Sequence, residues 1–213
     1  MLITLEGGEG VGKSTQERLL SEYLTACGLD VVRTREPGGT AVAEEIRQVL
    51  LTPRDAGLNA RAEALLFAAA RAEHVARVIR PALDRGAVVV CDRFLDSSVA
   101  YQGFGRELGP EFIRDLSLWA TEGLAPDLVI VLDLDPEVGL GRLSSADRLE
   151  REPLAYHQRV RAGFLAIASG DPHRHAIVDA SAPAETVAEG VRARVRSRLV
   201  SIGLLKPGIE AGT

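Results

Sequence analysis

The sequence predicts an α/β fold in which helices cover both faces of a parallel sheet. Continuous apolar runs of strand length alternate along the chain with longer segments of helical periodicity. Apolar runs without polar alternation are typical of strands buried on both faces, and their alternation with helices indicates parallel pairing. The length of 213 residues is ordinary for one such domain. We expect it to cover residues 1–203, followed by a flexible tail at 204–213 that contains Pro207, Gly208 and Gly212.

Each element follows from its local pattern. The apolar runs predict strands at Leu2–Leu5, Val31–Thr34, Ala87–Cys91, Leu128–Leu134 and Ala176–Val178. Apolar residues three and four apart predict helices at Thr15–Cys27, Val42–Leu51, Ala60–Asp84, Pro110–Thr121, Tyr156–Ala168 and Ala184–Val200. In such sheets ligands bind at the carboxyl ends of the strands. The loops after the first four strands are therefore expected to lie together.

The loop after the first strand carries the strongest motif. Residues 7–14 read Gly-Gly-Glu-Gly-Val-Gly-Lys-Ser, a G-x-x-x-x-G-K-S string between an apolar run and a helix. Glycines let backbone N–H groups surround phosphate oxygens, and the helix N-terminus adds partial positive charge. Lys13 can reach between the outer phosphates, and the Ser14 hydroxyl can bind Mg²⁺. A glycine-rich turn that binds nothing is the weaker alternative. The expected nucleoside triphosphate site comprises Gly7, Gly8, Glu9, Gly10, Val11, Gly12, Lys13, Ser14 and Thr15.

Composition narrows the class of partner. The net charge is −5 and the isoelectric point about 5.5, which argues against a nucleic-acid polymer. No apolar run is long enough to cross a membrane, and the first residues lack the features of a signal peptide. Two cysteines, Cys27 and Cys91, are best interpreted as reduced thiols. A cytoplasmic protein is expected.

Two further segments suggest an acceptor site. After the second strand, Arg35-Glu36-Pro37-Gly38-Gly39-Thr40 predicts a rigid loop with Thr40 as the cap of the next helix, although any good turn could look the same. In the third helix, Phe67 and Arg71 are four residues apart and share a face. This pair suits a base stacked on the ring and read by the guanidinium; the alternative is an ordinary core aromatic.

Polar groups also follow the third and fourth strands. Asp92 can take part in the coordination shell of Mg²⁺, and Arg93 can bind a phosphate with two parallel bonds; a local ion pair is the alternative. The polar segment Leu95–Gly103 is expected to form a specificity loop. The arginine-rich segment Arg142–Pro153 suits a mobile flap over transferring phosphates, but alone it equally suits a solvated loop.

Together these segments resemble the bacterial thymidylate kinases, P-loop nucleoside-monophosphate kinases that make dTDP from dTMP and ATP. The matching strings are Glu6–Thr15, Thr34–Thr40, Phe67–Arg71, Asp92–Phe94, Ser97–Gly103 and Asp147–Glu150. The resemblance runs from Met1 to about Leu199. It implies the three-layer P-loop NTPase fold, with five parallel strands flanked by helices and a short mobile lid at about residues 142–153. It also implies Mg²⁺ as cofactor, a role in dTTP synthesis and a homodimer.

The resemblance further implies roles for individual residues. Lys13 and the loop amides would hold the ATP phosphates, Ser14 and Asp92 would lie at the metal, and Arg142 would lie near the adenine. The dTMP site would comprise Glu9, Arg35, Pro37, Phe67, Arg71, Arg93, Ser98, Tyr101 and Gln102. Within it, Phe67 would stack on thymine and Arg93 would grip the phosphate, and Tyr101 would disfavour a 2′-hydroxyl.

The catalytic charge is expected from the lid. The variable positions of the P-loop, Gly8 to Val11, hold no basic residue. In the lid-arginine class of the family the lid then supplies the charge, and Arg148 is the first candidate and Arg151 the second. Two alternatives stay open: a kinase for another small acceptor, and a nucleotide-dependent switch module.

Overall fold

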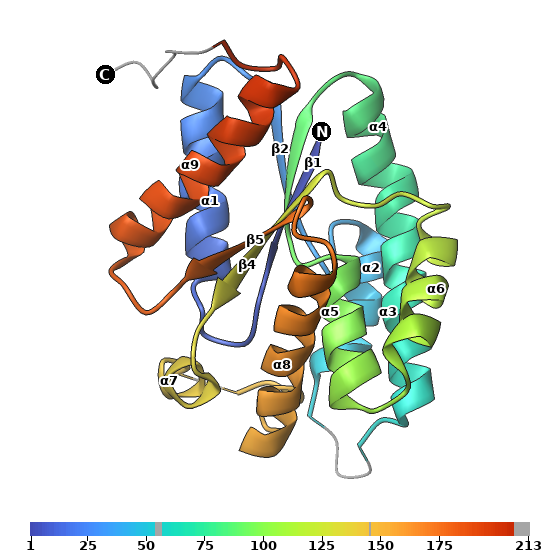
Figure 1. Ribbon diagram of the computed structural model, residues 1–213. Coiled ribbons are helices and arrows are strands. Elements are labelled where there is room, and N and C mark those ends of the chain that lie inside the picture. Colours follow the sequence, from blue (N-terminus) through green and yellow to red (C-terminus); the bar gives the residue numbers. More distant parts are fainter. Residues whose placement is uncertain (54–56, 145, 207–213) are drawn as a thin grey trace.

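The computed structural model describes residues 1–53, 57–144 and 146–206. Within these residues five strands form one parallel sheet in the order β2-β3-β1-β4-β5 (Figure 1). Every predicted strand is present, and its ends lie within one residue of the prediction. The bounds are β1 Leu2–Glu6, β2 Val31–Arg35, β3 Val88–Asp92, β4 Leu128–Asp133 and β5 His175–Asp179.

Helices connect the strands, and the predicted ones are present. Their bounds are α1 Lys13–Ala26, α2 Ala41–Leu51, α3 Ala60–His74, α4 Arg80–Asp84, α5 Leu95–Ser98, α6 Pro110–Ala120, α7 Pro136–Gly141, α8 Leu154–Gly170 and α9 Ala184–Ser201. The predicted long helix at 60–84 comprises α3 and α4, joined by a π-helical turn at Val75–Ile79. Thr40 caps α2 as expected, because its hydroxyl oxygen accepts a bond from the N–H of Ala43 at 3.1 Å.

One segment predicted as a loop is helical. Residues Leu95–Ser98 form α5, and Val99–Gly105 continue it as a π-helix. Most of its side chains are buried, so its backbone groups need partners inside the protein, and helical bonding provides them. The short helix α7 was also not predicted; it begins at Pro136, with Asp135 accepting a bond from the N–H of Glu137.

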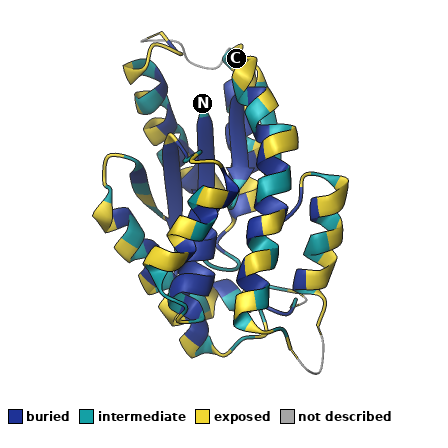
Figure 2. Ribbon diagram, turned by 90° about the vertical axis from the view of Figure 1, so that its right-hand side faces the viewer, coloured by how far each residue is buried: buried dark blue, intermediate teal, exposed yellow. Residues whose placement is uncertain are grey.

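The sheet lies between two layers of helices (Figures 1 and 2). Successive side chains of a strand point to opposite faces of the sheet, so each strand packs against both layers. Ile3 and Leu5 face α1 and α9, where they pack with Leu20, Val191 and other apolar residues. Leu2 faces the opposite layer and packs with residues of the π-helical turn and α4. The predicted α/β fold with a parallel sheet flanked by helices is thus confirmed.

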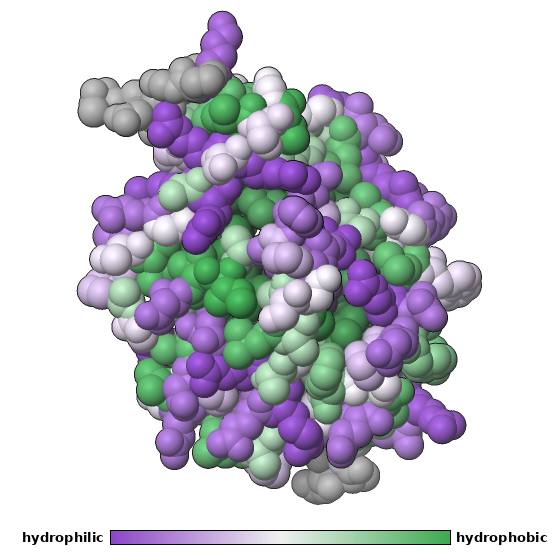
Figure 3. Space-filling view, viewed as in Figure 1, coloured by the Kyte–Doolittle hydropathy of each residue, from purple (hydrophilic) through white to green (hydrophobic). Residues whose placement is uncertain are grey.

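The end of the chain differs from the expected tail where it is described. Leu205 is buried and packs against the same apolar cluster as α1 and α9. The predicted tail residues 207–213 lie outside the described residues. None of the described helices is long and apolar enough to cross a membrane. On the face seen in Figure 3, hydrophilic and hydrophobic residues are interspersed.

Candidate active site

A cavity of about 450 Å³ opens at the carboxyl ends of the central strands. Most predicted site residues line it, although they come from six segments of the chain. These lining residues are Glu9, Gly10, Gly12, Lys13, Ser14, Thr15, Arg35, Pro37, Phe67, Arg71, Asp92, Arg93, Ser98, Tyr101, Gln102 and Arg142. The volume is within the range of small-molecule sites. The side chain of Val11, by contrast, is buried in the apolar core beneath the loop.

Backbone crowding explains two glycines of the loop after β1. A Cβ atom on Gly7 would lie 2.4 Å from the carbonyl oxygen of Leu132 by ideal geometry, and one on Gly10 would overlap the carbonyl of Gly139. Both glycines also have positive φ angles, 136° and 64°, which disfavour other residues. The close approach of this loop to β4 at Gly7 and to α7 at Gly10 thus depends on having no side chain at either position.

Lys13 lies within this loop as the P-loop motif predicts. Its ammonium group donates to the carbonyls of Gly8, at 2.5 Å, and Gly7, at 3.2 Å. Burial and the nearby positive charge of Arg93 lower the pKa of Lys13 to about 8, although Glu9, Asp92 and Glu6 oppose the shift. The lysine is therefore a cation in a confined, partly uncompensated position, which suits an anionic ligand.

Ser14 and Asp92 form a pair of hard oxygen donors at the cavity. The Ser14 hydroxyl donates to the Asp92 carboxylate at 2.8 Å. Mg²⁺ prefers one or two protein oxygens together with phosphate oxygens and waters, so these two residues fit that ion. Among the described residues no group of three or more His, Cys, Asp or Glu side chains could hold a metal by itself.

Glu9 joins the P-loop to the acceptor side of the cavity. Arg93 donates to Glu9 at 2.9 Å, and Tyr101 donates to its other oxygen at 2.6 Å. Burial alone would raise the pKa of Glu9, but the charges of Arg93 and Lys13 and the Tyr101 bond lower it to about 2. The Arg93 guanidinium also lies 4.9 Å from the Tyr101 ring centroid. Glu9 thus holds Arg93 in place.

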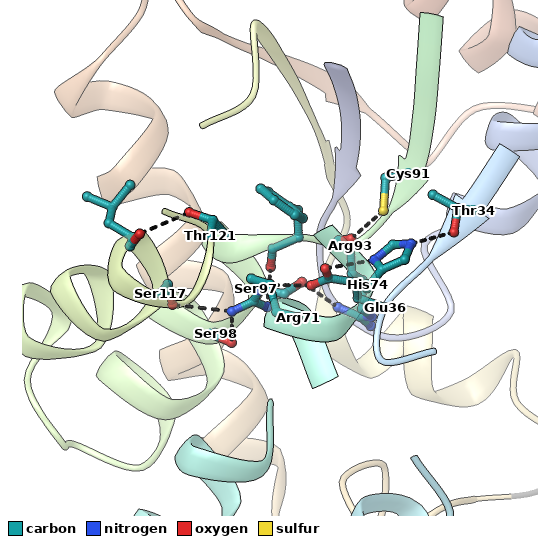
Figure 4. A network of polar contacts seen from close by, with 12 residues as sticks. Thr34, Glu36, Arg71, His74, Cys91, Arg93, Ser97, Ser98, Ser117 and Thr121 are labelled. Carbon is teal, nitrogen blue, oxygen red and sulfur yellow. Dashed lines mark hydrogen bonds and ion pairs between the residues drawn. The ribbon is translucent and has the colours of Figure 1, made fainter. Parts of the chain in front are cut away.

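Arg71 lines the cavity and lies in a buried polar network (Figure 4). Its Nε donates to Glu36 at 2.7 Å, Nη1 donates to Ser98 and Ser117, and Nη2 donates to the Phe94 carbonyl at 3.0 Å. The other oxygen of Glu36 is bonded to His74 at 3.0 Å. Four of the five Arg71 N–H groups are thus used in the described contacts. One Nη2 N–H is left for a ligand.

The remaining acceptor-side residues are held by ordinary contacts. Phe67 lies one helical turn before Arg71 and lines the same cavity. Gln102 donates to Glu63, and Arg35 forms a pair with Glu44 in which both bonds are 2.9 Å. Arg35 is therefore engaged by an exposed carboxylate in this structure.

The three lid arginines lie in different places. Arg142 lines the cavity, and its Nη1 is 3.3 Å from the carbonyl oxygen of Gly10. Arg148 is only 9% exposed and pairs with the buried Glu63, and Arg151 donates to Ala146 at the surface. Neither belongs to the described residues that line the cavity. The expectation that Arg148 or Arg151 supplies the catalytic positive charge of the lid stays a prediction.

The sequence patterns missed several residues at the cavity. Arg47 of α2 lines it and donates to the Pro37 carbonyl at 2.8 Å. Burial, and then the neighbouring Arg35, lower the pKa of Arg47. The sequence signal for Arg47 was its position nearly two turns into the helix that follows the Arg-Glu-Pro-Gly-Gly-Thr loop. Asp147 and Glu150 of the lid also line the cavity and cap each other's backbone.

Comparisons with known proteins agree with this geometry. A family model described as thymidylate kinase matches residues 5–191. A thymidylate kinase from Leifsonia xyli is 56% identical over 203 residues, covering 93% of this chain and 96% of that protein. One from Symbiobacterium thermophilum is 52% identical, with coverages of 93% and 94%. The crystal structure of thymidylate kinase from Ehrlichia chaffeensis superposes with a TM-score of 0.75 at 35% identity, covering 92% of this chain and 98% of that one. The chain belongs to the thymidylate kinase family.

Proposed function

We propose that the protein transfers the γ-phosphoryl group of ATP to dTMP, giving dTDP and ADP for dTTP synthesis. One observation carries this proposal: two cations suited to phosphate, Lys13 and Arg93, line the same cavity and both donate to the carbonyl of Gly7. Lys13 belongs to the triphosphate loop, whereas Arg93 lies on the acceptor side. A second phosphate site is expected of a kinase whose acceptor already carries a phosphate.

The transfer needs two polyanions in line more than it needs acid–base chemistry. An oxygen of the dTMP phosphate forms a bond to the γ-phosphorus, and the bond from that phosphorus to the β,γ-bridging oxygen breaks, leaving ADP. Lys13 and Arg93 reduce the repulsion between the two ligands, and an arginine of the lid adds a third positive charge; Arg148 is the first candidate and Arg151 the second. Mg²⁺, held by Ser14 and Asp92, supplies further screening when bound.

The acceptor side fits a thymine nucleotide. Phe67 offers a ring for stacking, and the free N–H of Arg71 can donate to a base carbonyl. Ser98 holds Arg71 in this position, and Tyr101, fixed by its bond to Glu9, leaves little room for a 2′-hydroxyl. Arg35, Pro37 and Gln102 complete the wall around the nucleotide.

We also propose a homodimer. Large apolar side chains are exposed on neighbouring helices: Val42 and Val49 on α2, Leu65 on α3, and Phe112 and Trp119 on α6. Trp119 is 79% exposed, and aromatic residues are enriched in protein interfaces. We further propose one domain at residues 1–203 with a mobile lid at about 142–153, and a cytoplasmic location, consistent with the free thiols of Cys27 and Cys91.

A coupled ADP-release assay with ATP and Mg²⁺ tests the proposal across dTMP, dUMP, dCMP, dGMP, AMP, UMP and thymidine. We expect fast turnover of dTMP and slower turnover of dUMP, because the missing methyl group costs about 1 kcal/mol, or about fivefold. Preference for another acceptor would favour a different kinase on the same fold. ATP binding without turnover of any acceptor would favour the switch module instead.

A further inference from the structure

A buried carboxylate is one of the groups that hold the lid to the body of the protein. Glu63, on the first turn of α3, is fully buried and receives bonds from three side chains. Arg148 of the lid lies 2.7 Å from its Oε2, and Arg106 donates to both of its oxygens at 3.2 and 3.0 Å. Arg106 also reaches the lid, where it pairs with Glu152 at 2.7 Å. Two lid residues are thus tied to Glu63, one directly and one through Arg106.

Arg148 has little freedom to leave this position. Its Nε donates to the Leu50 carbonyl at 2.6 Å, and its backbone N–H donates to the Leu51 carbonyl at 3.1 Å. Its Nη2 is buried without a partner among the described residues, so the guanidinium faces protein and not the cavity. The next residue, Leu149, is buried in the apolar cluster that contains Tyr156 and Phe164. These contacts fix the lid at Arg148 and leave the Arg142 end beside the P-loop.

The same carboxylate is linked to the nucleotide side. Glu63, Phe67 and Arg71 follow one another at four-residue spacing, so they share a face of α3. Phe67 and Arg71 line the cavity, and Gln102, which also lines it, donates to Glu63 at 2.9 Å. One helix therefore carries both the base-facing side chains and the support of the lid.

We propose that Glu63 is a positioning residue for the lid, and that Arg148 is the lid's anchor on Glu63 and not the charge at the transferring phosphate. This inference rests on the proposed kinase function. Removing the anchor lowers the fraction of molecules whose lid is in the competent position. The apparent affinity for ATP falls by that fraction, whereas the chemistry of a closed complex changes less.

A double-mutant cycle with Glu63→Gln and Arg148→Gln tests the pairing. We expect each single variant to raise KM for ATP by about tenfold with kcat lowered less than threefold, and the double variant to resemble either single one. Arg148→Lys, which keeps the charge, should recover part of the loss. Glu73→Gln is the matched control, since it removes a half-buried carboxylate of the same helix that pairs with the exposed Arg77, and it should change neither constant.

A fall in kcat of about 10³ or more in Arg148→Gln, with normal kcat in Glu63→Gln, would overturn the inference and return the catalytic role to Arg148. Additive effects in the double variant would also overturn it. Thermal melting of each variant separates lid effects from loss of folding, and Glu63→Asp replaces Glu63→Gln if the latter does not fold.

A second readout needs no catalysis. Trypsin can cleave after Arg142, Arg148 and Arg151, and mass spectrometry identifies the fragments. We expect Glu63→Gln to be cut at the lid several times faster than the unmodified protein or Glu73→Gln. Equal cleavage rates would contradict the anchor. If the unmodified protein turns over no acceptor, the proposed function fails, but this measurement still decides the anchor.

Discussion

The pKa of Lys13 predicts how ATP use depends on pH. In the free enzyme burial and Arg93 lower this pKa to about 8, so the ammonium group loses its proton as pH rises through that value. The charged form is the one expected to bind the ATP phosphates. For a single ionisation, kcat/KM for ATP should fall by about 2-fold at pH 8, about 11-fold at pH 9 and about 100-fold at pH 10.

Initial rates at limiting ATP and saturating dTMP, measured from pH 6.5 to pH 10, give this profile. ATP is already fully ionised above neutral pH, and burial raises the pKa of Tyr101 and of Cys91 well above their ordinary values. Neither group should contribute to the alkaline fall. Lys13→Arg is the control, because an arginine stays charged throughout and should give a level profile if it retains activity.

A level profile in the unmodified enzyme would refute the reasoning, since it would mean that Lys13 stays protonated to pH 10 or does not contact ATP. A fall of the same size and midpoint in Lys13→Arg would refute it too. The fall would then belong to another group.

Three further outcomes are expected. Arg71→Met should lower the free energy of unfolding by about 3–5 kcal/mol and Tm by about 6–20 °C, because the buried Glu36 loses its charged partner. The control Arg18→Met removes an exposed arginine and should change Tm little. Calorimetry measures both variants. Tyr101→Ala should raise the ratio of kcat/KM for ribothymidine monophosphate to that for dTMP, and an unchanged ratio would remove Tyr101 from sugar selection. Trp119→Asp should convert a dimer into a monomer of about 22.8 kDa in sedimentation, while Val138→Asp, at an exposed site on α7, should leave the mass unchanged.

Local sequence patterns were enough to predict the strands and most of the cavity. Apolar runs mark strands that are buried on both faces, and the P-loop residues act through backbone geometry that the motif itself encodes. The carboxyl-end rule then placed Asp92 and Arg93 beside Lys13 without any knowledge of side-chain contacts.

What the patterns missed depends on contacts between distant segments. Glu63 and Arg148 are 85 positions apart, and nothing in either neighbourhood indicates that they pair. Arg47 is an isolated arginine in an amphipathic helix, where a solvated position is the usual outcome. The polar residues of 95–103 suggested a loop, but burial by the surrounding helices favours internal backbone bonding, so the segment is helical.

The bonding of Arg71 has a consequence for discrimination between pyrimidines. Glu36, Ser98, Ser117 and Phe94 orient its guanidinium before any ligand arrives, and these contacts leave one N–H without a partner among the described residues. Thymine and uracil present an acceptor oxygen where cytosine presents an amino group, which is itself a donor. If this N–H faces that position of the base, it would disfavour dCMP by placing two donors opposite each other, with no conformational change needed. It would tolerate changes elsewhere on the ring, such as at the methyl position, that leave the oxygen in place.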